Sequence, residues 1–187
     1  MKIGKRIVAV MAVLGGWFTL SCRAPEHHPH LVASRGTEST MDVAEITPQQ
    51  AKKLLDSNQG YVYLDVRTES EFAAGHVPDA WNIPVAQMDP AGGGMVLNPD
   101  FLAVVRANLP LDAKVVCGCR SGKRSEMAVR ILLEAGYQGA VNMEGGFAGQ
   151  TDATGEVLVE GWSTLGYPVS HGDDRGRTHA EIRVAGE

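Results

Sequence analysis

Apolar runs and helical apolar patterns alternate along the middle of the chain. The runs are short and occupy residues 61–66, 80–84, 114–117 and 140–143. The run at 114–117 is continuous, as in strands buried on both faces of a parallel sheet. The helical patterns lie between them, after Thr47, after Thr68, after Asn98 and over residues 125–135. This alternation predicts an open α/β sheet covered by helices on both faces.

Capping boxes mark two of these helix starts. Thr47 is followed three residues later by Gln50, and Thr68 by Glu71. In this arrangement each side chain accepts a hydrogen bond from the backbone N–H of the other residue. Pro48 stands at the first helical position, where its missing N–H costs nothing. The helix starts are therefore the best-defined boundaries in the sequence.

The N-terminal 43 residues are expected to lie outside the fold. Three cations, Lys2, Lys5 and Arg6, precede an uncharged apolar run from Ile7 to Leu20. That run is short for a membrane helix of about 20 residues, but it fits the hydrophobic region of an export signal. We therefore interpret residues 1–21 as a signal peptide.

The residues after this run predict that the chain is attached to a membrane through a lipid. Phe18 to Cys22 resembles the lipobox of bacterial lipoproteins, which implies that Cys22 becomes the acylated first residue. Cleavage after Ala24 and an uncleaved anchor are the alternatives. Acyl chains would hold the protein firmly at a membrane of the cell envelope, facing the periplasm or the outside.

Residues 22–43 are expected to form a flexible tether, because they are polar and contain Pro, Ser, Thr and Gly. The tether's histidines could bind a metal, but no further ligands lie close to them, and tether composition is the better interpretation; they are His27, His28 and His30. Residues 171–187 are charged and are expected to be a frayed tail.

Charge and cysteine content exclude some functions. The formal net charge is -5, so no basic surface for nucleic acid is expected. Three cysteines do not indicate a disulfide scaffold. Export would place the protein in an oxidising compartment, where a reactive thiol needs a reductant or a sulfur donor to cycle it.

The segment from Cys119 to Ser125 carries the candidate chemistry. It follows a buried strand and precedes a helix, so its backbone N–H groups can turn inward and form an anion-binding cradle. The helix N-terminus adds partial positive charge. Cys119 would lie at the bottom of this cradle. A plain connection with a core cysteine would not be followed by such a cation-rich run.

The loop composition favours a thiolate. Helix N-termini and nearby cations lower the pKa of a cysteine thiol, and the loop supplies three cations, Arg120, Lys123 and Arg124. Gly122 allows a tight turn or a positive φ, and Ser121 can donate a hydrogen bond to a bound oxyanion or sulfur. We therefore expect Cys119 to be ionised at neutral pH and open to solvent.

These segments together resemble a rhodanese domain. The resemblance extends from residue 44 to 170 and is closest to single-domain bacterial and plant members. The matching segments are Leu64–Arg67, Glu71–Phe72, Gly75–Val77, Ala80–Pro84, Cys119–Ser125, Asn142–Phe147 and Gly166–Val169. The resemblance implies an open, mostly parallel five-stranded sheet with helices on both faces.

The resemblance also implies a mechanism. Cys119 would take a sulfane sulfur from a donor such as thiosulfate and pass it from a persulfide to cyanide or a thiol. Backbone N–H groups from Arg120 to Arg124 would stabilise the persulfide, and Arg120 with Lys123 would hold the sulfonate. No cofactor or metal is required. The alternative is a membrane-anchored persulfide carrier, sensor or interaction module that serves a protein acceptor.

Loop length separates this chain from related phosphatases. Cell-cycle phosphatases of this fold separate Cys and Arg by five residues, whereas here only four lie between Cys119 and Arg124. The shorter loop favours sulfur transfer. A further departure is the insert from Ala148 to Glu160, since many members reach the following Trp within a few residues. The insert is expected to form a small hairpin that shapes acceptor access.

Four other residues have alternative roles. Asp65 and Arg67 could contact the active loop, but a structural ion pair that anchors it is favoured. His76 could be a general base, although a hydrogen-bonded turn histidine is the better interpretation. Cys117 could be a resolving thiol, and a buried strand cysteine is favoured instead.

Overall fold

The computed structural model describes residues 42–172 and 177–185. The predicted signal peptide, the predicted lipidation site Cys22 and nearly all of the predicted tether, its histidines included, lie outside the described residues. Among the helices that are described, none is both long and apolar enough to cross a lipid bilayer.

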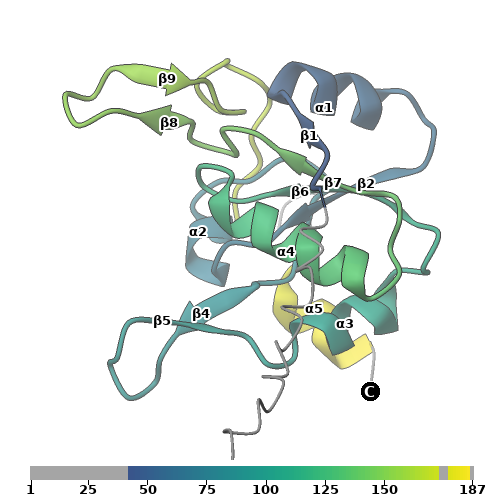
Figure 1. Ribbon diagram of the computed structural model, residues 1–187. Coiled ribbons are helices and arrows are strands. Elements are labelled where there is room, and N and C mark those ends of the chain that lie inside the picture. Colours follow the sequence, from purple (N-terminus) through teal and green to yellow (C-terminus); the bar gives the residue numbers. More distant parts are fainter. Residues whose placement is uncertain (1–41, 173–176, 186–187) are drawn as a thin grey trace, which may run out of the picture. The chain divides into compact units, whose positions relative to one another are not determined.

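The central sheet has five parallel strands in the order β1-β7-β6-β2-β3 (Figure 1). They are β1 (Glu45–Ile46), β2 (Tyr61–Asp65), β3 (Trp81–Asn82), β6 (Lys114–Gly118) and β7 (Ala140–Met143). This confirms the expected open parallel sheet. Its middle strand is β6, and ligands in such sheets bind at the carboxyl ends of the strands.

Helices cover both faces of the sheet, as predicted. They are α1 (Pro48–Asp56), α2 (Glu69–Ala73), α3 (Phe101–Asn108), α4 (Lys123–Glu134) and α5 (His179–Ala185). Successive strand residues point to opposite faces. Leu64 and Val115 therefore pack in one core with α3, α4 and α5, whereas Tyr63 and Val116 pack in a second core with α1 and α2.

The helix starts agree with the capping signals. Both capping boxes are formed, by Thr47 with Gln50 and by Thr68 with Glu71. Helix α3 starts later than its pattern indicates, because the Asn98 side chain accepts a hydrogen bond from the backbone N–H of Asp100 at 3.1 Å and holds a turn there.

Two antiparallel hairpins project from the domain, both toward the left in Figure 1. One joins β4 (Ala86–Met88) to β5 (Met95–Leu97), two strands that the sequence patterns do not predict. The other joins β8 (Gln150–Thr151) to β9 (Val157–Val159). The second hairpin is the one expected for the insert after Phe147.

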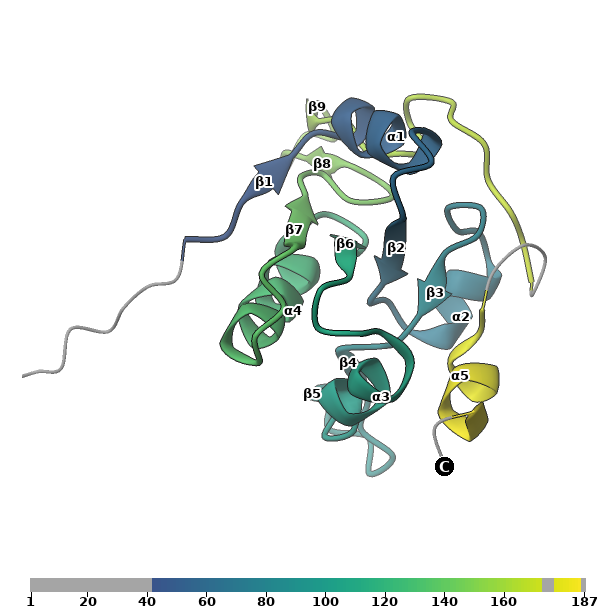
Figure 2. The same ribbon diagram turned by 90° about the vertical axis from the view of Figure 1, so that its right-hand side faces the viewer.

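The expectation of a frayed C-terminal tail is wrong for residues 177–185. Helix α5 lies beside α3 in both views (Figures 1 and 2). Ile182 is 3% exposed and belongs to the core, and His179 lies 2.8 Å from the carboxylate of Glu69. The charged composition conceals these two inward-facing positions, so the domain extends past its predicted end at residue 170.

This packing predicts that Ile182→Asp lowers the free energy of unfolding by at least about 3 kcal/mol, because it removes apolar burial and places a carboxylate in the core. Urea unfolding measures the change. Ala180→Asp introduces the same group at an exposed position of the same helix and should cost less than about 1 kcal/mol. Equal stability of the two variants would contradict the docking of α5.

Candidate active site

Cys119 directly follows the last residue of β6 and begins the loop that leads into α4. Its Sγ accepts a hydrogen bond from the backbone N–H of Gly122 at 3.2 Å. The Ser125 hydroxyl lies 3.4 Å from the same sulfur. The loop therefore turns polar N–H and O–H groups toward the sulfur atom, an arrangement that favours negative charge on it.

The sulfur is not open to solvent, contrary to expectation. Cys119 is only 1% exposed and Ser125 is fully buried. The first turn of α4 contacts the sulfur through the Ser125 hydroxyl, and the backbone after β7 packs against the loop. The backbone N–H of Phe147 donates to the carbonyl of Cys119 at 2.7 Å.

Residues 147–150 hold the outer side of the loop. Three successive loop carbonyls, those of residues 119, 120 and 121, accept hydrogen bonds from this segment. The donors are the backbone N–H of Phe147 at 2.7 Å, the backbone N–H of Ala148 at 2.8 Å and the Gln150 side-chain amide at 2.9 Å. Because a trans peptide places its C=O and N–H on opposite sides, the N–H groups that follow these carbonyls point away from residues 147–150, and the Gly122 N–H among them donates to Sγ.

Two glycines make this arrangement sterically possible. Gly122 has a φ of 100°, the positive value expected for the turn, and acts as N-cap of α4. At Gly146 an added Cβ would lie 2.3 Å from the carbonyl oxygen of Cys119. The approach of the segment after β7 to the active loop therefore requires a residue without a side chain at position 146.

Asp65 and Arg67 form a buried ion pair beside the loop. The Arg67 guanidinium contacts the Asp65 carboxylate at 2.6 Å and donates to the carbonyl of Gly75 at 2.7 Å. Burial lowers the pKa of Arg67, but the hydrogen bonds and charge of Asp65 outweigh it, so the net pKa is raised. The guanidinium lies 4.3 Å from the Phe147 ring and so supports the segment that holds the loop.

Arg124 is engaged by a carboxylate. Its two terminal nitrogens each donate to Glu71 at 2.7 Å. Burial alone would raise the pKa of Glu71, but the hydrogen bonds and charge of Arg124, together with hydrogen bonds from Thr68, lower it to about 2. The charge of Arg124 is thus used to tie the loop to α2, and it is not free for an incoming anion.

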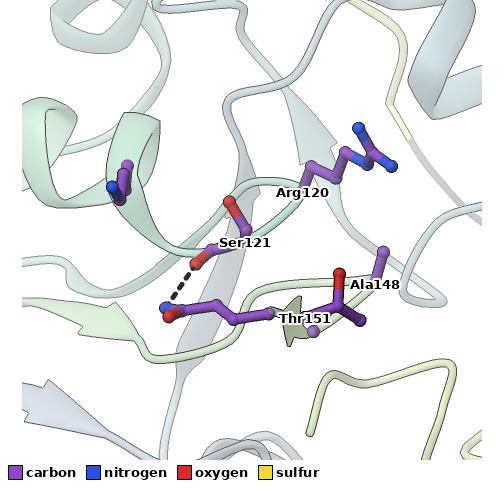
Figure 3. A pocket seen from close by; sticks show the side chains of 7 residues that line it. Arg120, Ser121, Ala148 and Thr151 are labelled. Atoms are coloured by element: carbon purple, nitrogen blue, oxygen red, sulfur yellow. Dashed lines mark hydrogen bonds between the residues drawn. The ribbon is translucent and has the colours of Figure 1, made fainter. Parts of the chain in front are cut away.

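Arg120 and Lys123 are both exposed, and neither has an ion-pair partner in the described part of the chain. They line a hollow of about 430 Å³ between the active loop and the insert hairpin. In Figure 3, Arg120 and Ser121 come from the loop, and Ala148 and Thr151 come from the facing segment. This polar, cationic hollow suits a small anion.

The remaining candidate residues have structural roles. Cys117 is fully buried in the sheet, and burial, with a contribution from nearby Cys119, raises the pKa of its thiol well above the usual range. His76 is fully buried, stacks on Phe72 and bonds through Nδ1 to the Phe72 carbonyl at 2.9 Å. Within the described residues, no cluster of His, Cys, Asp or Glu is arranged to hold a metal ion.

The fold and the site together define a class of α/β domains in which a cysteine follows the middle strand of a parallel sheet and lies in the loop before a helix. The chain belongs to the rhodanese-like domain family, whose defining pattern matches residues 47–153.

Relatives support this assignment along most of the domain. Rhodanese-like domain-containing protein 17 of Arabidopsis thaliana is 37% identical over 70% of this chain and 83% of its own length. Thiosulfate sulfurtransferase 18 of the same plant is 38% identical over 64% of this chain and 86% of its own length. The crystal structure of Rv0390 from M. tuberculosis matches with a TM-score of 0.58 and 36% identity, over 70% of this chain and 98% of that one.

The sequence patterns do not predict the role of the segment after β7. They place the cysteine loop correctly, but they give no reason to connect it with Phe147, Ala148 and Gln150. The available signal is the pair Gly145-Gly146, since adjacent glycines between a strand and an insert indicate a close backbone approach.

The Glu71–Arg124 pair predicts a defined acid sensitivity. The folded-state pKa of Glu71, about 2, lies below its value of about 4.3 in an unfolded chain. The pair therefore adds stability above that unfolded value, and this stability is lost as the pH falls toward 2. Glu71→Gln should lower the free energy of unfolding by about 1–2 kcal/mol at pH 7 and by much less near pH 2.

Urea titrations at several pH values measure this effect. Glu126→Gln is the matched control, because Glu126 also pairs with an arginine of α4 but at a more exposed position. If Glu71→Gln and wild type lost stability in parallel between pH 5 and about 2, the buried pair would not be a source of acid sensitivity.

Proposed function

We propose that the protein is a sulfurtransferase that carries a sulfane sulfur on Cys119. The observation that carries the proposal is the environment of Sγ, which accepts the Gly122 N–H at 3.2 Å in a loop whose Arg120 and Lys123 form no ion pair with any described residue. Relatives named thiosulfate sulfurtransferase support the choice of reaction. Arg120, Lys123 and Ser121 are the residues proposed to hold the anionic end of the donor.

The reaction proceeds in two displacements. The Cys119 thiolate attacks the outer sulfur of thiosulfate, the bond between the two donor sulfurs breaks, and sulfite leaves with the electron pair. The acceptor, cyanide or a thiolate, then attacks the outer sulfur of the persulfide and regenerates the thiolate of Cys119. Neither step needs an external oxidant or reductant, and Cys119 is the nucleophile of the first step and the leaving group of the second.

In the resting structure the sulfur is buried, which restricts the access of a donor to it. Arg120 is exposed and lines three hollows around the loop, so we assign to it the first contact with an incoming anionic donor. Once the persulfide forms, the outer sulfur lies about 2 Å beyond Sγ. The group that reacts in the second step is thereby carried toward the surface.

We also propose, from the sequence alone, that residues 1–21 direct export and that Cys22 is acylated. Such an anchor would keep the domain at a membrane surface through the tether that follows. The intact mass of the protein recovered from a membrane fraction tests this directly, since acylation and cleavage each change it.

Cys119→Ser should reduce thiocyanate formation from thiosulfate and cyanide at least about a thousandfold, because the nucleophile is lost. Intact mass after thiosulfate treatment should show one added sulfur in wild type and none in this variant. Cys117→Ala is the matched control, since its thiol is buried in the sheet, and it should keep both properties. Thiocyanate formation that survives Cys119→Ser would refute the assignment.

A second function, delivery of sulfur to a protein thiol, is favoured by an apolar groove next to the loop. The groove is about 610 Å³ and lies between the β4–β5 hairpin, α2 and the active loop. Its exposed apolar residues are Met88, Met95, Val96 and Leu97. Exposed methionines suit adaptable protein contacts, and Arg120 supplies positive charge at the groove. The occupant we propose is a cysteine-bearing protein segment with apolar and acidic side chains.

Leu97→Asp should slow sulfur transfer to such a segment about tenfold through lost apolar burial and charge repulsion, and leave the cyanide reaction unchanged. The probe is a reduced peptide whose cysteine is flanked by leucine and glutamate. Leu111→Asp is the matched control, since Leu111 is about as exposed, at 56% against 59%, and lies off the groove. Equal peptide rates in the two variants would exclude the groove as the docking site.

A further inference from the structure

The insert hairpin contributes one side chain that bonds to the active loop. Gln150 is the first residue of β8 and donates through Nε2 to the carbonyl of Ser121 at 2.9 Å (Figure 3, dashed line). The peptide that carries this carbonyl continues into the N–H of Gly122. That N–H is the donor to Cys119 Sγ at 3.2 Å.

The Gly122 N–H is the donor on which the sulfur depends most. The Ser125 hydroxyl also lies near Sγ, at 3.4 Å, but it lies closer to the carbonyl of Gly122, at 2.9 Å. A hydroxyl has one proton to donate, so the Ser125 proton is divided between two acceptors. The Gly122 N–H donates to the sulfur, and no second acceptor shares its proton among the described residues.

The orientation of this peptide is not fixed by the loop alone. Gly122 has a φ of 100°, in a region where glycine has wide conformational freedom. The carbonyls of residues 119 and 120 are held by backbone donors, whereas the carbonyl of Ser121 accepts from a side chain. The last peptide before α4 therefore depends on a side chain that the insert supplies.

Gln150 is itself held firmly enough to act as a support. It pairs with Val159 across the hairpin, and the preceding residue, Gly149, donates to the carbonyl of Gly145 at 2.8 Å. The hairpin is thus anchored at its base, beside β7, and its first strand residue reaches back to the loop.

We propose that Gln150 is a positioning residue: by holding the Ser121 carbonyl it keeps the Gly122 N–H aimed at Cys119 and so stabilises the anionic sulfur. This inference rests on the proposed sulfur-transfer role of Cys119 for its biological meaning. The structural claim concerns the charge state of the sulfur, so it can be tested without turnover. It also gives the insert a function beyond lining the hollow beside the loop.

The test is the pH dependence of thiolate absorbance in the far ultraviolet, taken as the difference between each protein and the same protein with Cys119→Ser. Gln150→Met keeps the length of the side chain and removes the donor. Gln150→Asn keeps the amide but shortens its reach by one methylene. Both variants should raise the midpoint of thiolate formation by about half to one pH unit, since part of a hydrogen bond to a charged group is lost.

Gln138→Met is the matched control, because it makes the same change at an exposed residue in the turn before β7; its midpoint should equal that of wild type. Thermal unfolding of each variant verifies that the fold is kept. An unchanged midpoint in Gln150→Met would overturn the proposal. An unchanged midpoint in Gln150→Asn together with a shift in Gln150→Met would also overturn it, because general polarity would then be the cause.

Failure of this inference can be told from failure of the proposed function. If wild type forms thiocyanate and Gln150→Met keeps the wild-type midpoint, the positioning role is wrong and the sulfurtransferase assignment stands. If the midpoint shifts while wild type transfers no sulfur to cyanide or to the peptide thiol, the positioning role stands and the assigned reaction is wrong.

Discussion

The hydrogen bonds that three consecutive loop carbonyls accept from residues 147–150 determine the chemistry of the site. A strand-to-helix loop has no intrinsic reason to turn its amides toward one atom. Here the carbonyls are drawn outward by a neighbouring segment, and the planarity of the peptide sends the amides inward. The close approach needed for this depends on Gly146, where any side chain would meet the loop backbone.

The cations of the loop divide into two groups by what surrounds them. Arg124 is bound by Glu71, and the neighbouring Arg67 is bound by Asp65, so both position the loop and have little charge left for a ligand. Arg120 and Lys123 lie on the open side, without ion-pair partners in the described residues. Composition alone suggests one undivided positive field. In the structure, Arg124 and Arg67 are held in ion pairs, whereas Arg120 and Lys123 are available to bind an anion.

The sequence predicts those features of the fold that depend on neighbouring residues, and it fails for features that depend on residues far apart in the chain. The capping boxes at Thr47 and Thr68, the uninterrupted strand 114–117 and the cysteine loop depend on neighbours in the chain, and these expectations agree with the structure. The docking of Ile182 onto α3 and the bond from Gln150 to Ser121 join residues far apart in sequence. A periodic pattern carries no information on such contacts, so the sequence predicts a frayed tail and a hairpin at the insert, but not the contacts that either makes.

The burial of Cys119 also bears on the conflict between a reactive thiol and an oxidising compartment. A thiolate exposed to solvent is open to oxidation to sulfenic and higher acids. At 1% exposure, the resting sulfur is shielded from such oxidants. An anionic donor differs from a neutral oxidant in being attracted to Arg120 and Lys123, which line the hollow next to the active loop. Burial of the sulfur and cations on the open side of its loop would thus favour the donor over the oxidant, which the export proposed from the sequence would require.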